Sequence, residues 1–330
     1  MLRQRGHRSE IFALSIDAEL RNDVRPFADP EARRGDVTVL HFAVPSPLTE
    51  ALAELPGRRI LQYHNVTPAH FFAPYDPGIF RIASLGRAEV KTLVGRVDLA
   101  LGVSEYNRRE LEALGFTNTA VMPIVVDTRR ITDAPRLPAL ERTLDDGLAN
   151  ILFVGRIAPN KKVEDLVKMA EHYKRYVDIE YRFIFVGRTD AVPRYYAMLR
   201  ALIAEYRMPA GRFLFTGSVP DVELAAYYRA ASAYVSLSEH EGFCVPLVEA
   251  MAADVPVLAF GAAAVPETLG GAGVCFNPKD LEHAAELLGL LVYDDALRSA
   301  VIAGQRRRLA DFGSERAGRV LDDLLASLTA

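Results

Sequence analysis

Two glutamates, Glu241 and Glu249, are separated by seven residues in the segment SEHEGFCVPLVEAM, residues 238–251. Between them, Gly242 permits a tight backbone turn and Pro246 suits the first turn of a helix. A helix that begins there exposes amides that can bind an anion or a sugar hydroxyl, namely those of Phe243, Cys244 and Val245. Glu249, about one turn into this helix, can accept both hydroxyls of a ribose. The alternative is that both are ordinary exposed glutamates, as most Glu residues are.

Two cations occur in another informative segment, VGRIAPNKK, residues 154–162. Gly155 ends a predicted strand, and Arg156 and Lys161 lie in the loop that follows it. At the carboxyl edge of a parallel sheet, such a pair can clamp a diphosphate, with Arg supplying a bidentate fork and Lys a point charge. The alternative is a pair of solvated loop charges. Because both segments follow strands of one predicted sheet, we expect the two cations and the two carboxylates to converge on one pocket.

The second half of the chain alternates short β-rich runs with amphipathic helical runs, which indicates a parallel sheet covered by helices. We predict strands at 150–154, 181–186, 212–216, 233–237 and 255–260. Predicted helices lie at 163–176, 193–206 and 221–230, and a further one starts near Val245. This order is typical of a doubly wound, Rossmann-like domain, whose ligands bind at the carboxyl ends of the strands.

The first half repeats this pattern less regularly. Its predicted strands are 9–14, 36–41, 59–63, 98–103 and 119–122, and Ser104 is a suitable N-cap for the helix that follows the fourth of them. The polar segment 127–149 contains two prolines and is predicted to be the interdomain linker. We therefore expect an α/β protein with two domains and a cleft between them.

The opening segment, MLRQRGHRSE, reads as the end of a helix that runs into a strand, with no strand before it. In a doubly wound sheet the first strand usually lies in the middle. The buried aliphatic side chains of such a strand contribute about 1.5–3 kcal/mol each. Losing it would forfeit roughly 10 kcal/mol, which is as large as the net stability of a whole domain. We therefore expect that either the gene start is truncated or another element fills this position.

The composition is that of an ordinary globular protein: half of the 330 residues are apolar, a quarter are charged and the net charge is −4. Lys and Arg residues are scattered, which argues against a nucleic-acid binder. Two cysteines, Cys244 and Cys275, cannot form a disulfide framework, and no His/Cys cluster has zinc spacing. The first residues lack the apolar core of a signal peptide, and no apolar run is long enough for a membrane span. These features predict a cytoplasmic location.

These segments together resemble the retaining family 4 glycosyltransferases, which have the GT-B fold of two Rossmann-like domains facing each other across a cleft. The resemblance spans almost the whole chain. Its most specific part runs from Glu241-Gly242-Phe243 through Pro246 to Glu249-Ala250-Met251. Corroborating parts are Gly155-Arg156 with Lys161, Thr216-Gly217-Ser218-Val219, and Val126-Asp127, which is similar to the end of the family's N-G-V-D turn.

The resemblance implies a role for each matching residue. Arg156 and Lys161 would neutralise the leaving nucleoside diphosphate, Glu249 would hold the ribose, and Glu241 would hydrogen-bond the donor sugar. The rest of the donor site would be formed by Gly155, Gly217, Ser218, Val219, Gly242, Phe243, Cys244 and Val245. Similar enzymes need no metal ion and no cofactor, because protein cations stabilise the leaving group.

In the first domain, His64 follows a predicted strand in the segment LQYHNVTP. The resemblance implies that it faces the donor sugar across the cleft and shields the oxocarbenium-like transition state. The alternative is a histidine that packs in the core or caps a turn. Asn65 and Thr67 either assist it or form the turn before Pro68.

The chain departs from the family pattern at its start. Family 4 enzymes normally open with a strand and a glycine-rich loop on the acceptor side, and neither is present here. Lys162 and Cys244 each stand where glycine is common. We expect an acceptor-side domain at 1–135 that is incomplete at its start, and a donor domain at 136–330. The last helix, about 314–330, is expected to pack back on the N-terminal domain.

The leading hypothesis is a metal-independent hexosyltransferase that uses a nucleotide sugar and retains the anomeric configuration. Its acceptor would be a glycan, a lipid-linked molecule or a small molecule, in surface polysaccharide or glycoconjugate synthesis. The main alternative is a degenerate transferase that acts as a nucleotide-sugar-binding scaffold, with a second copy or partner chain supplying the first strand. A GT-B epimerase is a third reading. The basic helical segment 79–97 can rest on an anionic membrane, although a solvated helix face is the simpler interpretation.

Overall fold

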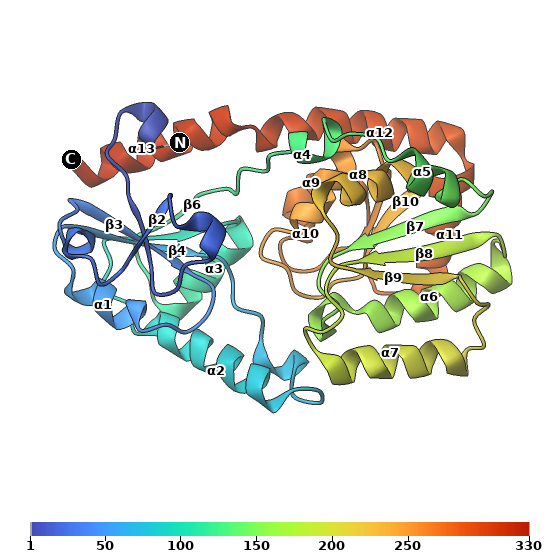
Figure 1. The fold of residues 1–330 in the computed structure, drawn as a ribbon, viewed down its shortest axis with the longest axis horizontal. Helices are drawn as coiled ribbons and strands as arrows, with labels where there is room; N and C mark the ends of the chain where they lie inside the picture. Colours follow the sequence, from blue (N-terminus) through green and yellow to red (C-terminus); the bar gives the residue numbers. More distant parts are fainter. Residues whose placement is uncertain (1, 330) are drawn as a thin grey trace.

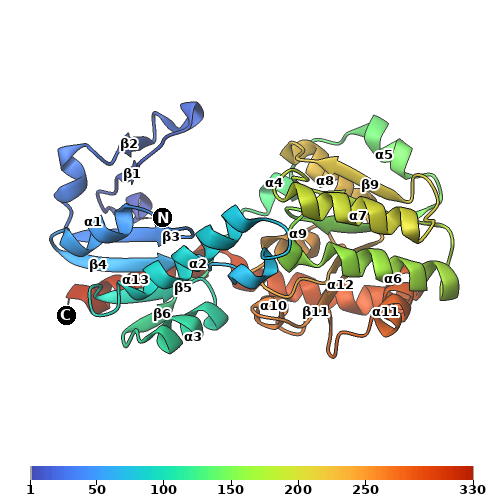
Figure 2. The same cartoon turned by 90° about the horizontal axis from the view of Figure 1, so that it is seen from below.

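The computed structural model describes residues 2–329, which form two α/β domains lying side by side (Figure 1). Met1 and Ala330, which end two of the predicted segments, lie outside the described residues. The N-terminal domain contains a four-stranded parallel sheet and, apart from it, a pair of parallel strands. Figure 2 shows this pair set to one side of the main sheet.

The strands of the N-terminal domain are β1 (Ile11–Ala13), β2 (Val24–Pro26), β3 (Val37–Phe42), β4 (Arg58–Tyr63), β5 (Leu99–Gly102) and β6 (Thr119–Val121). Its α-helices are α1 (Leu48–Glu54), α2 (Pro77–Lys91) and α3 (Glu105–Leu114), and its 3₁₀ turns are η1 (Arg3–Arg5), η2 (Ala18–Leu20), η3 (Pro30–Arg33) and η4 (Ala69–Phe71). The main sheet has the order β3-β4-β5-β6. As predicted, Ser104 caps α3, because its hydroxyl accepts the backbone N–H of Asn107.

The C-terminal domain has the strands β7 (Ala149–Val154), β8 (Tyr181–Val186), β9 (Phe213–Gly217), β10 (Ala233–Ser236), β11 (Val257–Phe260) and β12 (Val274–Phe276). The helices around them are α4 (Arg129–Thr132), α5 (Pro138–Leu144), α6 (Val163–Tyr176), α7 (Pro193–Glu205), α8 (Asp221–Ala230), α9 (Val245–Ala252), α10 (Val265–Leu269), α11 (Leu281–Tyr293) and α12 (Asp295–Leu309). Two 3₁₀ turns, η5 (Pro159–Lys161) and η6 (Ala310–Phe312), and the last helix, α13 (Ser314–Thr329), complete the chain.

All strands of the C-terminal sheet are parallel, in the order β12-β11-β10-β7-β8-β9. Its first strand, β7, lies in the centre, whereas β3 lies at the edge of the main N-terminal sheet. Val39 on β3 is 40% exposed, which is unusual for a valine in a doubly wound sheet. That another element fills the position beside β3 stays a prediction.

Both faces of the C-terminal sheet are buried, which explains why its strands read as continuous apolar runs. Along β7, Ile151 and Phe153 pack on the face covered by α6, α7 and α11, whereas Leu152 packs on the face covered by α8 and α9. The predicted helices 163–176 and 221–230 are confirmed to the residue by α6 and α8. The sequence patterns do not reveal α1, β2, β12 or the helices from α10 to α12.

The predicted linker 127–149 is not an extended connection. It contains α4 and α5, whose residues Ile131 and Leu144 are buried in the same apolar cluster as Tyr228 of α8. This correction has a simple reason: two short helices can be anchored by one apolar side chain each, which leaves too little periodicity to recognise. The polar composition of the segment reflects its exposed face.

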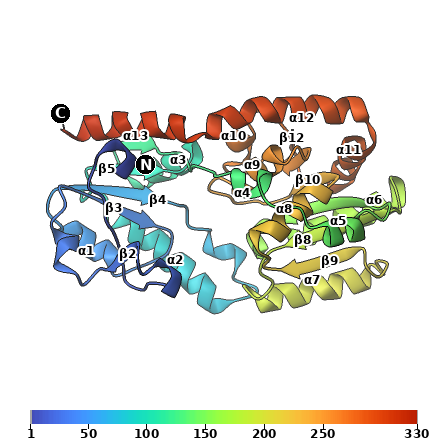
Figure 3. The same ribbon diagram turned by 45° about the horizontal axis from the view of Figure 1, so that its top comes forward.

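The C-terminal helix returns along the N-terminal domain, as Figures 1 and 3 show. Arg5 donates a hydrogen bond to Asp322 at 2.8 Å, and Leu324 packs against an apolar cluster of Ile60, Leu99 and Leu101. In the described part of the chain, no helix is both long enough and apolar enough to cross a bilayer.

Candidate functional site

The candidate site lies where the C-terminal sheet changes direction. β7 and β10 are neighbours, and the strands that follow each of them extend to opposite sides. Such a switch point leaves a crevice at the carboxyl ends of the strands, which is where doubly wound domains bind ligands. The loop after β7 carries Gly155, Arg156 and Lys161, and the loop after β10 carries Glu241.

Glycines line the adjoining sheet edge because backbones approach closely there. Gly155 (φ +152°) donates its N–H to the carbonyl of Val186, and Gly187 donates to the carbonyl of Gly217, each at 2.9 Å. A Cβ on Gly187 would lie 2.1 Å from the carbonyl oxygen of Gly155, so no other residue fits. Beyond Gly217 the edge is open, and Ser218 is exposed. This part of the predicted donor site, which continues to Val219, therefore has accessible backbone.

Lys161 and Glu241 meet in this crevice. The Lys161 Nζ lies 2.5 Å from Oε1 and 2.7 Å from Oε2 of Glu241, and the two side chains are only 19% and 9% exposed. Asn160 joins the two loops, because its side-chain amide donates to the carbonyl of His240 at 3.1 Å. Arg156 is exposed at the same strand end, and it has no ion-pair or hydrogen-bond partner among residues 2–329. Lys161 is thus paired with Glu241, whereas Arg156 is available to contact a ligand.

The N-terminus of α9 provides hydrogen-bond donors beside this ion pair. Cys244 precedes the helix with a left-handed backbone (φ +73°), and no described residue accepts the backbone N–H groups of Gly242, Phe243 or Cys244. These amides and the positive end of the helix dipole favour an anion. Burial, and then the charge of Glu241, raises the pKa of the Cys244 thiol, which is consistent with an inert packing residue.

Glu249 lies one helix turn further on and is 1% exposed. Its Oε2 accepts the hydroxyl of Tyr228 at 2.9 Å, and its Oε1 contacts the guanidinium of Arg130. Both predicted glutamates are therefore buried, and the alternative that they are ordinary exposed side chains is wrong. Sequence analysis had no signal for Arg130, which comes from α4 at a separation of 119 residues.

His64 lies at the end of β4, but its hydrogen-bond partner belongs to its own domain. Its Nε2 is 2.8 Å from Nδ1 of His41, and the two rings stack with their centroids 5.1 Å apart. Burial lowers the pKa of both imidazoles, so the pair is neutral near pH 7. No described contact joins His64 to the C-terminal domain, and its role toward a donor sugar stays a prediction.

Asn65, the next residue, is the one that crosses the cleft. Its Oδ1 lies 2.7 Å from Nε2 of His240, and its backbone has a left-handed conformation (φ +78°). A Cβ on Gly242 would come within 2.8 Å of the Asn65 Cβ, so this glycine is needed for the domains to meet here. His240 was not among the predicted site residues, although it immediately precedes Glu241.

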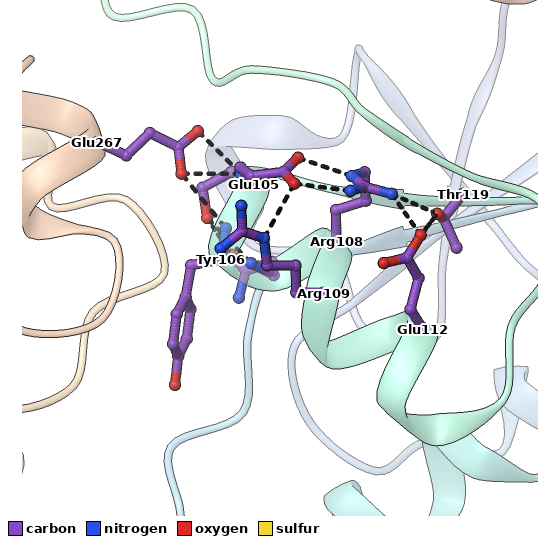
Figure 4. Close-up of polar contacts among 9 residues, drawn as sticks. Glu105, Tyr106, Arg108, Arg109, Glu112, Thr119 and Glu267 are labelled. Carbon is purple, nitrogen blue, oxygen red and sulfur yellow. Dashed lines mark hydrogen bonds and ion pairs between the residues drawn. The ribbon is translucent and has the colours of Figure 1, made fainter.

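A second contact between the domains lies at the start of α3 (Figure 4). The carboxylate of Glu267, on α10, accepts the backbone N–H of Glu105 at 2.8 and 2.9 Å and that of Tyr106 at 3.3 Å. A carboxylate at a helix N-terminus satisfies free amides and interacts favourably with the helix dipole. The C-terminal domain thereby caps a helix of the N-terminal domain, a pairing that local sequence does not reveal.

The burial of His240 at the contact between the domains predicts a pH dependence of stability. Burial, followed by the nearby Arg87 charge, lowers the pKa of His240 from 6.5 to about 4. Between these values the unfolded chain binds the proton and the folded chain does not, so stability falls as the pH drops from 6.5 to 4. The full effect is about 3 kcal/mol. Urea unfolding at a series of pH values measures it.

His240→Gln removes the titration at nearly constant size, and it is expected to flatten this part of the pH profile. His283 is the matched control, because it is exposed on α11 and takes no part in the contact between the domains. The His283→Gln protein should keep the wild-type profile. Equal slopes for the wild type and His240→Gln would show that His240 does not cause the acid sensitivity.

One hollow in the described residues lies away from this crevice. It has a volume of about 740 Å³ and is lined by α5, the start of β7 and the end of α11. It is thus at the amino ends of the strands, which doubly wound domains do not use for ligands. We assign no function to it.

A protein-family model matches the part of the chain that forms the crevice. The model of a family described as glycosyl transferases group 1 matches residues 141–308, which is more than half of the chain and includes both loops and α9. The chain belongs to the group 1 glycosyl transferases. The predicted donor-site residues from Gly155 to Glu249 all lie in the region that the family model matches.

Two relatives of the chain are named mannosyltransferases. A GDP-mannose-dependent alpha-mannosyltransferase of Mycobacterium tuberculosis is 31% identical over 234 residues, which are 69% of this chain and 57% of that protein. The O-antigen chain mannosyltransferase B of Escherichia coli is 27% identical over 215 residues, which are 62% of this chain and 54% of that protein. The matched region thus covers little more than half the length of each relative.

A solved structure of HepE from Anabaena, in complex with UDP-glucose, has the same fold. Its TM-score is 0.76 at 16% identity, and the comparison covers 99% of this chain and 93% of that one. Similarity at this level of identity concerns the fold alone. It confirms the predicted GT-B architecture of two Rossmann-like domains across a cleft.

Proposed function

We propose that this chain is a retaining, metal-independent hexosyltransferase of family 4 that uses a nucleoside diphosphate sugar as its donor. The observation that carries the proposal is the buried pair of Lys161 and Glu241 beside the unpaired amides that precede α9. It unites a cation, a carboxylate and N–H donors at the switch point of the sheet, where nucleotides bind in doubly wound domains. Membership of the group 1 family supports the same donor class.

In this proposal the diphosphate lies against the N-terminus of α9, and Arg156 and Lys161 supply positive charge. As the bond between the sugar C1 and the phosphate oxygen breaks, its electron pair stays on the diphosphate, which these groups stabilise. The acceptor oxygen bonds to C1, and its proton leaves with the diphosphate. Glu241 hydrogen-bonds the sugar, and Glu249 accepts the ribose hydroxyls.

GDP-mannose is the donor that we propose to test first. The two relatives described above are named mannosyltransferases, and the name of one states its dependence on GDP-mannose. We propose a glycan, a lipid-linked molecule or a small molecule as the acceptor. No observation favours the degenerate scaffold, since the predicted cations and carboxylates are all present and Lys161 is paired with Glu241.

Nucleoside diphosphates are expected to stabilise the protein against heat. A ligand at 100 times its Kd adds about 2.7 kcal/mol, which corresponds to roughly 5–10 °C in Tm for a domain of 150–250 residues. A thermal-shift screen that compares GDP, UDP, ADP, TDP and their sugars measures this directly. The largest shift identifies the base.

Release of the nucleoside diphosphate from the best donor, with and without EDTA, then tests turnover and metal independence. Undiminished release in EDTA is the expected result. The proposal is contradicted if calorimetry detects no binding of any nucleoside diphosphate at millimolar concentration. Binding without turnover on glycan, lipid-linked or small-molecule acceptors would instead support the scaffold reading.

A further inference from the structure

Glu249 is held by two side chains from different elements. Arg130, on α4, contacts Oε1, and Tyr228, on α8, donates its hydroxyl to Oε2 at 2.9 Å. Arg130 is itself anchored, because its Nη1 lies 3.0 Å from Oδ1 of Asp221 at the start of α8. The guanidinium is 40% exposed, whereas the carboxylate that it contacts is 1% exposed. A buried carboxylate requires such a partner, since an unpaired one is strongly destabilising.

Two acceptor positions of Glu249 contact no described residue, and because the side chain is 1% exposed, a ligand reaches them only with a local rearrangement. An ionised carboxylate has about four acceptor positions, two on each oxygen. Arg130 uses one position on Oε1 and Tyr228 uses one on Oε2, so each oxygen keeps one free. Two free acceptors on adjacent oxygens match the two donors of a vicinal diol, such as the 2′- and 3′-hydroxyls of a ribose.

Tyr228 cannot take over the role of the cation. Burial, and then the charge of Glu249, raises the pKa of its hydroxyl well above the ordinary value, so it remains a neutral donor. Asp221, the other acid in the cluster, is 56% exposed and contacts the far side of the guanidinium. Arg130 is therefore the cation that directly contacts Glu249 in the described structure.

We propose that Arg130 is a positioning residue for donor recognition: it holds Glu249 in the orientation in which its two free acceptors receive the ribose diol. This inference rests on the proposed function. It makes a residue of the short helix α4 responsible for ribose selectivity, although that residue does not touch the ribose itself.

The test is calorimetry with a nucleoside diphosphate and its 2′-deoxy analogue on the full chain. Arg130→Gln is expected to weaken binding of the ribonucleotide about 10- to 100-fold, the value of hydrogen bonds to a charged group. Binding of the deoxy analogue should weaken less than that of the ribonucleotide, because only one diol hydroxyl remains to be lost. The selectivity between the two nucleotides therefore falls toward one.

Arg129→Gln is the matched control. Arg129 precedes Arg130 on α4, is 77% exposed and pairs only with Asp127, so the variant should keep wild-type selectivity. Arg130→Lys retains the positive charge beside Glu249, so it should be less destabilising than Arg130→Gln. It loses the planar fork that joins Glu249 and Asp221. Its selectivity should lie between those of the wild type and Arg130→Gln.

The outcomes separate the inference from the function on which it rests. No nucleotide binding by the wild type would remove both. Wild-type selectivity that is unchanged in Arg130→Gln and Arg130→Lys would remove the inference alone. Tighter ribonucleotide binding in Arg130→Gln would mean that Arg130 blocks the ribose position, and an equal loss for both nucleotides in either variant would mean a merely structural role. Each of these results overturns the proposal.

Discussion

Replacing Lys161 with methionine is expected to lower kcat about 10²–10³-fold, the usual effect of removing one group that stabilises charge in the transition state. The ammonium lies in a site that is mostly closed to water, where its interaction with a departing diphosphate is strong. Methionine preserves the length of the side chain and removes its charge. Steady-state kinetics with the best donor measure the change.

Loss of activity in this variant must be distinguished from loss of structure. Glu241 would be left buried without a cation, which destabilises proteins by about 3–5 kcal/mol. The double variant Lys161→Met/Glu241→Gln removes both charges, and we expect it to recover stability but not activity. Lys162→Gln is the control, because Lys162 pairs with Glu164 and Glu239 instead. Normal kcat in the double variant would refute a catalytic role for the pair.

Glu241→Ala is expected to depress kcat by a similar factor of about 10²–10³ while changing donor affinity little. Its carboxylate lies beside Lys161 and the amides before α9, where a donor sugar would react. Glu249→Ala should instead mainly raise the KM for the donor, because a ribose contact is equally strong in the ground state and the transition state. Kinetics on both variants with one donor separate the two roles.

The stability of both variants must be measured as well, because each substitution removes a buried carboxylate and leaves its cationic partner unpaired. Similar unfolding midpoints with different kinetic effects support the assignment. Small and equal kinetic effects from Glu241→Ala and Glu249→Ala would contradict it, because neither glutamate could then contact the donor.

Contacts across the cleft include Asn65 with His240, Asn65 with Gly242, and Glu267 with α3, together with ring contacts such as that of Tyr75 with Tyr195. The first two lie next to Glu241. Any change in domain orientation therefore alters the surroundings of the proposed reaction centre. The acid sensitivity of His240 makes this coupling measurable, since protonation places a charge on a buried imidazole whose Nε2 donates to Oδ1 of Asn65.

Much of the donor domain was predictable because its signals are local. Apolar runs identify strands that are buried on both faces, and helical spacing identifies α6 and α8 to the residue. The meeting of Lys161 and Glu241 followed from topology, since parallel strands end at the same edge of a sheet. The elements between residues 261 and 313 were not predicted; β12, for example, has three residues and offers no period to recognise.

The sequence by itself determined the fold class, the position of the crevice and the residue types that line it. Only the tertiary structure decided which side chains pair: Arg130 with Glu249 across 119 residues, Glu267 with the amide of Glu105 across 162, and Asn65 rather than His64 with the opposite domain. The physical reason is that the period of apolar residues reflects a single helix or strand. These pairs depend instead on how folded elements and whole domains pack against one another. Docking is set by shape and burial over many residues, and no short segment carries that information.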